Sequence, residues 1–310
     1  MGWKSLLGGT ALALVAAQAG WADGAACGKV RIADGGWTDI AFTNATAELL
    51  LGALGYESEQ TLLGLDVTYV SLQNDQVDVF QGNWRPVQDE QYKSYFDNNH
   101  VEVLGTNLTG AKYTLVVPDY VAAAGVTSFG DLAAHANEFD RRIYGIEPGT
   151  NQMLIDMIAA DRHRLGDWKV VESSEAGMLA QVARAVEKKE WIVFLGWAPH
   201  PMNVNYDITY LSGGDIEFGP DLGSATVWTL SRPGYAAECP NAAKLFANLT
   251  YDIDFENHGM QRIMGDGESP PDAARAMIAA EPERLDKWLD GVTTLAGEPA
   301  LPAVRAALGL

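Results

Sequence analysis

Cysteine is scarce in this chain, which has only two among its 310 residues, Cys27 and Cys239. Two distant cysteines with no histidine nearby supply too few ligands for a structural metal site, so no metal is expected. In an oxidising compartment an isolated pair forms one disulfide more often than it stays as two free thiols. We therefore predict a disulfide between Cys27 and Cys239, which ties the start of the chain to its last third.

Basic residues are also few. The chain has 21 Lys and Arg against 41 Asp and Glu, and its formal net charge is −20 at pH 7. Nucleic acids and anionic membrane surfaces attract positively charged proteins. The charge balance therefore argues against nucleic acid or an anionic membrane surface as a partner.

Long apolar runs are absent beyond the start of the chain. Lys4 precedes an apolar stretch at residues 6–17, which is too short to span a bilayer and is followed by small residues. This pattern is typical of a signal peptide. We expect residues 1–22 to be removed near Ala22, and the mature protein to be exported and soluble.

Enzyme signatures are missing. The histidines are scattered, at positions 100, 135, 163, 200 and 258, and no His-Glu-x-x-His arrangement occurs. There is no Gly-x-Ser-x-Gly elbow and no glycine loop of the phosphate-binding kind. The sequence therefore indicates a protein that is not an enzyme and needs no cofactor.

What the chain does contain is an alternation of strand and helix patterns, which predicts an α/β fold. Strands are expected at residues 29–33, 67–70, 77–80, 113–117 and 192–195. Residues 23–310 suffice for two lobes at about 150 residues per domain. Crossings between lobes are expected at 110–112 and in the glycine-rich stretch 213–223. They divide the chain into a discontinuous lobe I, 23–110 plus 214–310, and an inserted lobe II, 111–213.

Three tryptophans stand at the carboxyl ends of predicted strands, each beside a Gly or Pro: Trp37, Trp84 and Trp197. In open α/β sheets, ligands bind in the crevice beyond the strand ends. The faces of aromatic rings carry negative potential and attract cations. These tryptophans predict an aromatic box for an apolar cation, completed when the lobes close because Trp197 lies in the other lobe.

Three further residues are candidates for the same site. Tyr113, at the first crossing, is either a fourth wall or an ordinary strand residue. Asp39 is either a helix cap or an acceptor for a ligand hydroxyl that also attracts a cation. Asn151 precedes a predicted helix and likewise either caps it or holds the polar end of a ligand.

Several motifs occur in a fixed order that resembles a known family. They lie at residues 36–40, 78–84, 110–115, 144–149, 171–185, 194–203 and 210–215, and both cysteines fit the same pattern. The chain is similar to the periplasmic choline-binding proteins of bacterial ABC importers, within the wider group that binds quaternary amines such as glycine betaine.

The resemblance implies a two-lobed periplasmic binding protein of the class II type, with a sheet flanked by helices in each lobe and a ligand cleft between them. It implies that Asp39 and Asn151 hold the choline hydroxyl, and that a monomer hands the ligand to a membrane permease. The implied aromatic box is Trp37, Trp84, Tyr113 and Trp197.

Two places depart from the family pattern. The loop before Asn151 is shorter, so Thr150 is an alternative to Asn151 as the residue that faces the ligand. Arg85 follows Trp84, where an uncharged residue is expected. An inward Arg85 favours a ligand with a carboxylate, whereas an outward one leaves the box unchanged. The role of Trp228, inside a returning strand, stays open.

The polar end of the ligand decides between choline and glycine betaine, since both carry the same head group. A carboxylate at Asp39 accepts a hydroxyl proton and repels a carboxylate, so we expect choline. The alternatives are a binding protein for another methylated amine such as glycine betaine, an enzyme acting on a choline compound, or an adhesion protein without a small ligand.

Overall fold

The computed structural model describes residue 23 and residues 25–310. The predicted signal peptide, residues 1–22, lies outside this part of the chain. Within it, every helix is too short or too polar to span a bilayer.

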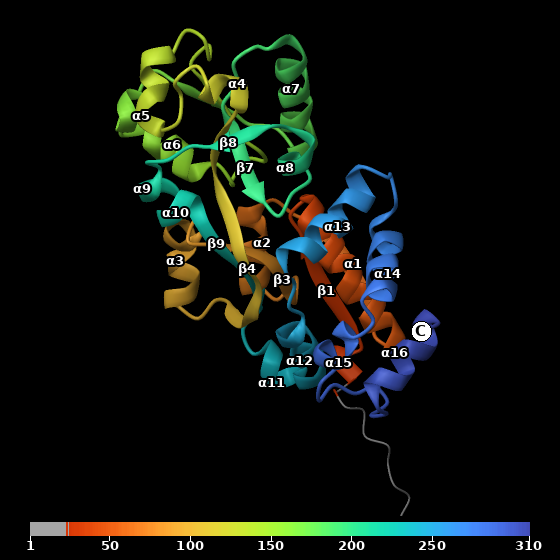
Figure 1. Ribbon diagram of the computed structural model, residues 1–310. Helices are drawn as coiled ribbons and strands as arrows, with labels where there is room; N and C mark the ends of the chain where they lie inside the picture. The colour runs from red at the N-terminus through yellow and green to blue at the C-terminus, as the bar shows by residue number, and fades with distance from the viewer. Residues whose placement is uncertain (1–22, 24) are drawn as a thin grey trace, which may run out of the picture.

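The lower lobe in Figure 1, lobe I, is built on a mixed sheet. Its first three strands are parallel, with β1 between β2 and β3, while β9 runs antiparallel to both β3 and β4. The strands are β1 (Lys29–Asp34), β2 (Glu57–Leu62), β3 (Val79–Arg85), β4 (Glu102–Pro118) and β9 (Ser224–Ser231).

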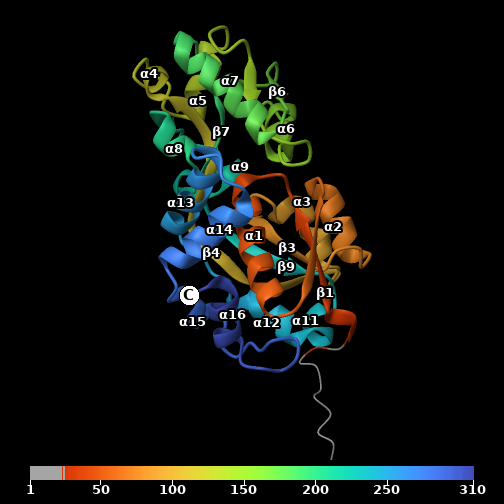
Figure 2. The ribbon, with the colours of Figure 1, turned by 90° about the vertical axis from the view of Figure 1, so that its right-hand side faces the viewer.

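Helices from both ends of the chain cover this sheet (Figures 1 and 2). The early helices are α1 (Thr38–Ala53), α2 (Leu65–Gln73) and α3 (Asp89–Asp97), after the short helix η1 (Ala25–Cys27). The late ones are α11 (Tyr235–Glu238), α12 (Pro240–Asn248), α13 (Ile253–Met264), α14 (Pro270–Ala280), α15 (Arg284–Trp288) and α16 (Ala300–Leu308). Helix α1 is the central one: it packs against β1, α13, α14 and α16, and its residues are buried on nearly every side, including the polar Asn44 and Thr46.

The upper lobe in Figure 1, lobe II, holds a smaller sheet in which β7 lies between β4 and β5, and β6 forms the edge. Its strands are β5 (Arg142–Tyr144), β6 (Lys169–Val171), β7 (Phe194–Ala198) and β8 (Ile208–Tyr210). Its helices are α4 (Asp119–Ala122), α5 (Phe129–Leu132), η2 (Ala133–His135), α6 (Gln152–Ala159), η3 (Arg162–Arg164), α7 (Glu175–Lys188) and α8 (Met202–Asn205).

One long strand joins the two lobes. In its first part β4 pairs with β9 of lobe I, from Glu102 to Lys112, and from Lys112 to Val116 it pairs with β7 of lobe II. The chain returns through α9 (Asp215–Phe218) and α10 (Pro220–Gly223). The described strands therefore form one hydrogen-bonded sheet that runs through both lobes. The residue-level boundaries given above stay a prediction.

The architecture confirms the predicted two-lobed α/β fold, but one predicted strand is wrong. Residues 67–70 lie in helix α2 rather than in a strand. The β-branched residues Val67 and Val70 suggested a strand, yet both side chains are exposed. Four of the five buried positions, Leu65, Thr68, Tyr69 and Leu72, follow the spacing of three and four residues of a helix face, and Ser71 is the fifth.

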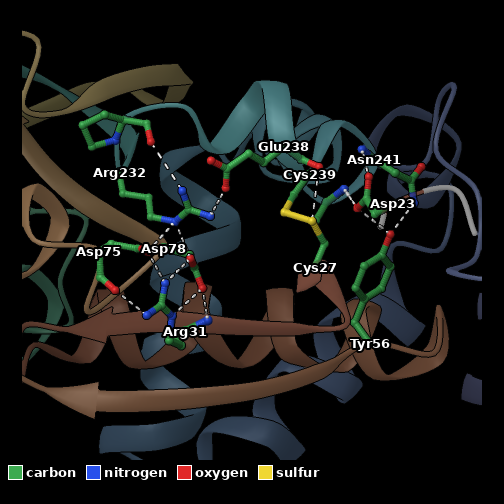
Figure 3. The surroundings of a disulfide bond; sticks show 12 residues. Asp23, Cys27, Arg31, Tyr56, Asp75, Asp78, Arg232, Glu238, Cys239 and Asn241 are labelled. Atoms are coloured by element: carbon green, nitrogen blue, oxygen red, sulfur yellow. Dashed lines mark hydrogen bonds and ion pairs between the residues drawn. A yellow bond between two sulfur atoms is a disulfide. The ribbon is translucent and has the colours of Figure 1, made fainter. Parts of the chain in front are cut away.

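The predicted disulfide is confirmed, and polar contacts surround it (Figure 3). Cys27 and Cys239 bridge a sequence separation of 212 residues. Beside the bridge, the Asp23 carboxylate accepts hydrogen bonds from the backbone N–H groups of Asn241 and Ala242 at the start of α12 and from the Tyr56 hydroxyl. These contacts fasten the start of the chain to its late helices.

A second group of contacts lies next to the bridge in Figure 3. The nearly buried Asp78 carboxylate accepts from the guanidinium groups of both Arg31 and Arg232, and Arg232 also donates to Glu238, next to Cys239. Burial opposes ionisation of Asp78, but the hydrogen bonds from Arg31 and Arg232 hold its pKa below the usual range. The network joins β1 and α11 through the residue that precedes β3 and the residue that follows β9.

Replacing both cysteines in Cys27→Ala/Cys239→Ala should lower the free energy of unfolding by about 2–5 kcal/mol, because the bridge constrains a long loop of the unfolded chain. Urea denaturation of oxidised wild type, reduced wild type and the double variant measures this loss. Equal midpoints for all three would contradict a stabilising role for the bridge.

Candidate ligand-binding site

A small cavity lies between the lobes, at the carboxyl ends of β3 and β7. Centres of water-sized molecules can occupy about 40 Å³ of it, which is room for about three waters or one small organic molecule. Lobe I contributes Trp37, Asp39, Leu65, Trp84, Val87, Gln88 and Gln91 to its lining, and β4 and lobe II contribute Tyr113, Ile146, Thr150, Met153 and Trp197.

The structure brings the four predicted aromatic residues together in this lining. Tyr113 and Trp197 lie opposite each other in the antiparallel pair of β4 and β7, and their ring centroids are 6.4 Å apart at 54°. Trp84, the residue before the last of β3, also lies near Tyr113, with ring centroids 6.1 Å apart at 51°. The rings are tilted toward one another rather than stacked, so their faces stay available to a ligand.

Trp37 reaches the cavity because of the turn between β1 and α1. Gly36 has φ +82°, a left-handed conformation that favours glycine, and Trp37 follows in extended conformation as the N-cap residue of α1. Its ring lies over Gly35, where an added Cβ would stand 3.3 Å from the indole. A side chain at position 35 would push this wall of the box out of place.

Tyr113 is supported from behind by the segment that returns from lobe II. The Phe218 ring of α9 stands edge-on to Tyr113 at 5.5 Å. A Cβ on Gly223 would stand 2.0 Å from the Tyr113 carbonyl oxygen, so only glycine fits this close approach. Burial raises the pKa of Tyr113, which keeps its phenol neutral.

Asp39 is the charged group of the cavity. It lies in the first turn of α1, is 4% exposed, and its Oδ1 accepts no hydrogen bond from the described residues. Burial, together with the nearby Glu175 carboxylate, raises the pKa of Asp39 to about 7. A buried carboxylate oxygen without a partner is costly, so this site is suited to a ligand that brings a donor or a positive charge.

The structure brings Thr150, and not Asn151, to the cavity wall. The Asn151 side chain is fully buried and bonds to the protein on both ends. Its Oδ1 accepts from the Ile146 N–H at 3.0 Å, and its Nδ2 donates to the Ile146 and Glu147 carbonyls and to Glu172. The Asn151 amide therefore shapes the loop that carries Thr150.

Arg85 and Trp228 lie outside the cavity lining. The Arg85 guanidinium forms an ion pair with Asp89 and stands 4.1 Å above the Trp228 ring. Both residues line a separate open hollow with Ser224 and Thr226. Arg85 thus points away from the aromatic box.

The remaining lining residues, among them Gln88 and Gln91, were not predicted from the sequence. Gln88 is fixed by its neighbours: its Oε1 accepts from Asn83 and Tyr69, and its Nε2 donates to the Gly82 carbonyl. Gln91 reaches across to lobe II and donates to the Gly149 carbonyl. The sequence offers one indication that Gln88 and Gln91 line the site, which is their position directly after the Trp84 motif. It offers none for Leu65 and Met153.

Two glutamates of lobe II, also unpredicted, hold the lobes together beside the cavity. Glu147 accepts a hydrogen bond from the Trp37 indole N–H at 2.9 Å. Glu175 accepts from the backbone N–H and the hydroxyl of Thr38, at 2.9 and 2.7 Å. The structure is therefore that of the closed protein.

No group of three or more His, Cys, Asp and Glu side chains in residues 23 and 25–310 is arranged to hold a metal ion. The chemistry of the cavity is that of aromatic faces and one carboxyl group. Such a lining is suited to a small organic cation.

Comparison with known proteins identifies the class of protein to which the chain belongs. Residues 28–280 match the family described as the substrate-binding domain of ABC-type glycine betaine transport systems. The chain belongs to this family of transport proteins, which confirms the resemblance seen in the sequence motifs.

Three individual proteins show how similar the chain is to proteins whose ligands are described. A solved ABC-transporter choline-binding protein in complex with choline is 50% identical, with a TM-score of 0.90 over 92% of this chain and 99% of that one. A lactococcal OpuAC complexed with glycine betaine is 29% identical, with a TM-score of 0.75 over 84% of this chain and 98% of that one. The glycine betaine/carnitine transport binding protein GbuC of Listeria monocytogenes is 29% identical over 50% of this chain and 51% of its own length.

The raised pKa of Asp39 predicts a pH-dependent closure of the lobes. The pKa of this carboxyl group is about 7 where the lobes are closed over it and returns toward its ordinary value of about 4 where water reaches it, so ionisation opposes closure as pH rises from about 4 toward 7. Ligand-free Asp39→Asn should therefore be closed to a greater extent than wild type at pH 8 and to nearly the same extent at pH 4.

Small-angle X-ray scattering of the ligand-free proteins across this pH range measures the difference in closure. The exposed Asp290→Asn is the matched control and should follow wild type at every pH. A constant difference between Asp39→Asn and wild type from pH 4 to pH 8 would contradict the assignment of a raised pKa to Asp39.

Proposed function

We propose that this protein is the extracytoplasmic substrate-binding protein of an ABC importer, that it captures choline between its lobes, and that it delivers the choline to a membrane permease. It acts in the periplasm as a monomer, without a cofactor and without catalysing a reaction. Membership of a transport family supports the role in import.

In the proposed complex the trimethylammonium group lies among Trp37, Trp84, Tyr113 and Trp197, whose faces attract it. The choline hydroxyl donates a hydrogen bond to Asp39, and Thr150 lies in the same lining as a second polar contact. Asn151 supports the site by holding the loop of Thr150.

The size of these contacts suits a small ligand. A desolvated cation–π contact contributes about 0.5–2 kcal/mol, and burial of the methyl groups adds about 25 cal/mol per Å². Micromolar affinity requires about 8 kcal/mol. Four rings and one carboxylate reach this value after part is offset by the cost of ordering the ligand and the lobes.

The observation that carries the choice of choline is the free Oδ1 of the buried Asp39. The cavity-lining residues include no Lys, Arg or His among the described part of the chain, so a ligand carboxylate would meet Asp39 without a positive partner. Choline offers a donor there instead. The 50% identical protein described in complex with choline supports the same ligand.

Glycine betaine is the second candidate, because its head group is the same and the matching family is described by it. The two ligands differ only at the end that meets Asp39. The charge of this one side chain therefore decides between them.

Wild-type protein at pH 8 should bind choline at least about tenfold more tightly than glycine betaine, because the ionised Asp39 repels a carboxylate. In Asp39→Asn, the affinity for choline should fall and the affinity for glycine betaine should rise. Titration calorimetry with both ligands measures the two affinities. Tighter betaine binding to wild type, or parallel weakening of both ligands in the variant, would overturn the choice of choline.

Truncating a wall of the box should weaken choline binding at least about tenfold, since one cation–π contact and its buried area are lost. The variants are Trp84→Ala in lobe I and Trp197→Ala in lobe II. Trp191→Ala, which removes a half-buried indole packed against Phe139 outside the cavity, is the matched control. Unchanged choline affinity in both cavity variants would show that the box is not the site.

A further inference from the structure

We propose that Glu147 and Glu175, which lie outside the cavity lining, are positioning and specificity-determining residues that make closure of the lobes depend on the positive charge of the ligand. The inference rests on the proposed function, since it concerns how a quaternary amine is told apart from a neutral molecule of the same shape.

Glu175 caps a helix that belongs to the other lobe. Helix α1 begins at Thr38, and its N-cap residue, Trp37, provides no side-chain hydrogen bond to the free N–H groups of the first turn. Glu175, the first residue of α7, supplies it by accepting from the Thr38 N–H and hydroxyl. The negative charge also meets the positive end of the α1 dipole.

Glu147 holds one wall of the box and is joined to Glu175. One of its carboxylate oxygens accepts from the Trp37 indole N–H at 2.9 Å, and the other accepts from the Glu175 backbone N–H at 3.0 Å. The bond fixes the angle of the Trp37 ring. A carboxylate that accepts from the indole N–H also makes the ring face more negative, which strengthens its attraction for a cation.

Closure brings these two carboxylates of lobe II against the start of α1, where Asp39 directly follows Thr38. Burial raises the pKa of Glu147, and Glu175 adds to that rise. Burial alone would raise the pKa of Glu175 as well, but the interaction with His200 and the hydrogen bonds from Thr38 hold it below the usual range.

No permanent cation offsets this negative charge. The partner of Glu175 in its own lobe is His200, whose Nε2 lies 2.9 Å from Glu175 while its Nδ1 accepts from the Met202 N–H. An imidazole that accepts at Nδ1 and donates at Nε2 is neutral. None of the hydrogen bonds that the described residues make to Glu147 or Glu175 comes from Lys or Arg.

The positive charge that balances the closed site is therefore that of the ligand. With a cation in the box, the three carboxyl groups attract it and the bonds to Trp37 and Thr38 form. With a neutral molecule of the same shape, the carboxyl groups repel one another across the lobes and closure is opposed. Charge thus selects the ligand through the movement of the lobes as well as through direct contact.

The test compares choline with 3,3-dimethylbutan-1-ol, in which carbon replaces the charged nitrogen. In wild type, saturating choline should close the lobes and the saturating neutral alcohol should leave them open, as measured by small-angle X-ray scattering. Calorimetry gives the ratio of the two affinities. Closure of the wild type by the alcohol to the same extent as by choline would overturn the proposal.

The variants Glu147→Gln and Glu175→Gln keep a hydrogen-bond acceptor and remove the charge. In each, the choline-to-alcohol affinity ratio should fall at least about tenfold, and the alcohol should now close the lobes. Glu187→Gln, an exposed position on the same helix as Glu175, makes the same change in net charge and should keep the wild-type ratio.

The outcomes separate this proposal from the proposed function. If wild type does not bind choline, the proposed function fails. If choline binds and closes wild type but both glutamine variants keep the wild-type ratio, the glutamates act only as hydrogen-bond acceptors and this inference alone is overturned. Unfolding of one variant leaves the other variant and the wild-type comparison to decide.

Discussion

Negative charge buried beside a box of aromatic rings strengthens the attraction of the box for a cation, and the fold must keep that charge without pairing it to a basic side chain. Asp39 meets this constraint at the start of α1, with one oxygen left free. Other features of the site follow from it. Among the described residues the lining contains no basic side chain, the aromatic rings line the same cavity as the carboxyl group, and the pKa of Asp39 stands well above its ordinary value.

In a two-lobed protein the free-energy cost of burying this carboxylate arises only when the lobes close. A carboxylate open to water is well solvated, and it becomes costly only when the lobes close and remove the water. In this protein β4 runs through both lobes and Gly223 permits the returning chain to approach the Tyr113 backbone closely. Tyr113 therefore belongs to the strand that connects the lobes, whereas Trp37 belongs to one lobe and Trp197 to the other.

Sequence patterns predicted the features that are local. Trp37, Trp84 and Trp197 each follow a strand beside a Gly or Pro, and that context alone indicated a cavity. The glutamates across the lobes had no such signal, because their partners lie 110 and 137 residues away along the chain. Thr150 and Asn151 are neighbours, and only the fold of their loop decides which of them faces inward. In α2, the β-branched residues on the exposed face led to the wrong prediction of a strand, although the buried residues have helical spacing.

The hydrogen bond between Trp37 and Glu147 has an optical consequence. The indole N–H belongs to one lobe and the carboxylate to the other, so the bond breaks whenever the lobes separate. Indole emission responds to the hydrogen bonding of that N–H and to exposure to water. Trp37 is therefore an intrinsic fluorescent reporter of lobe closure, placed by the fold at the point where the two halves of the protein meet.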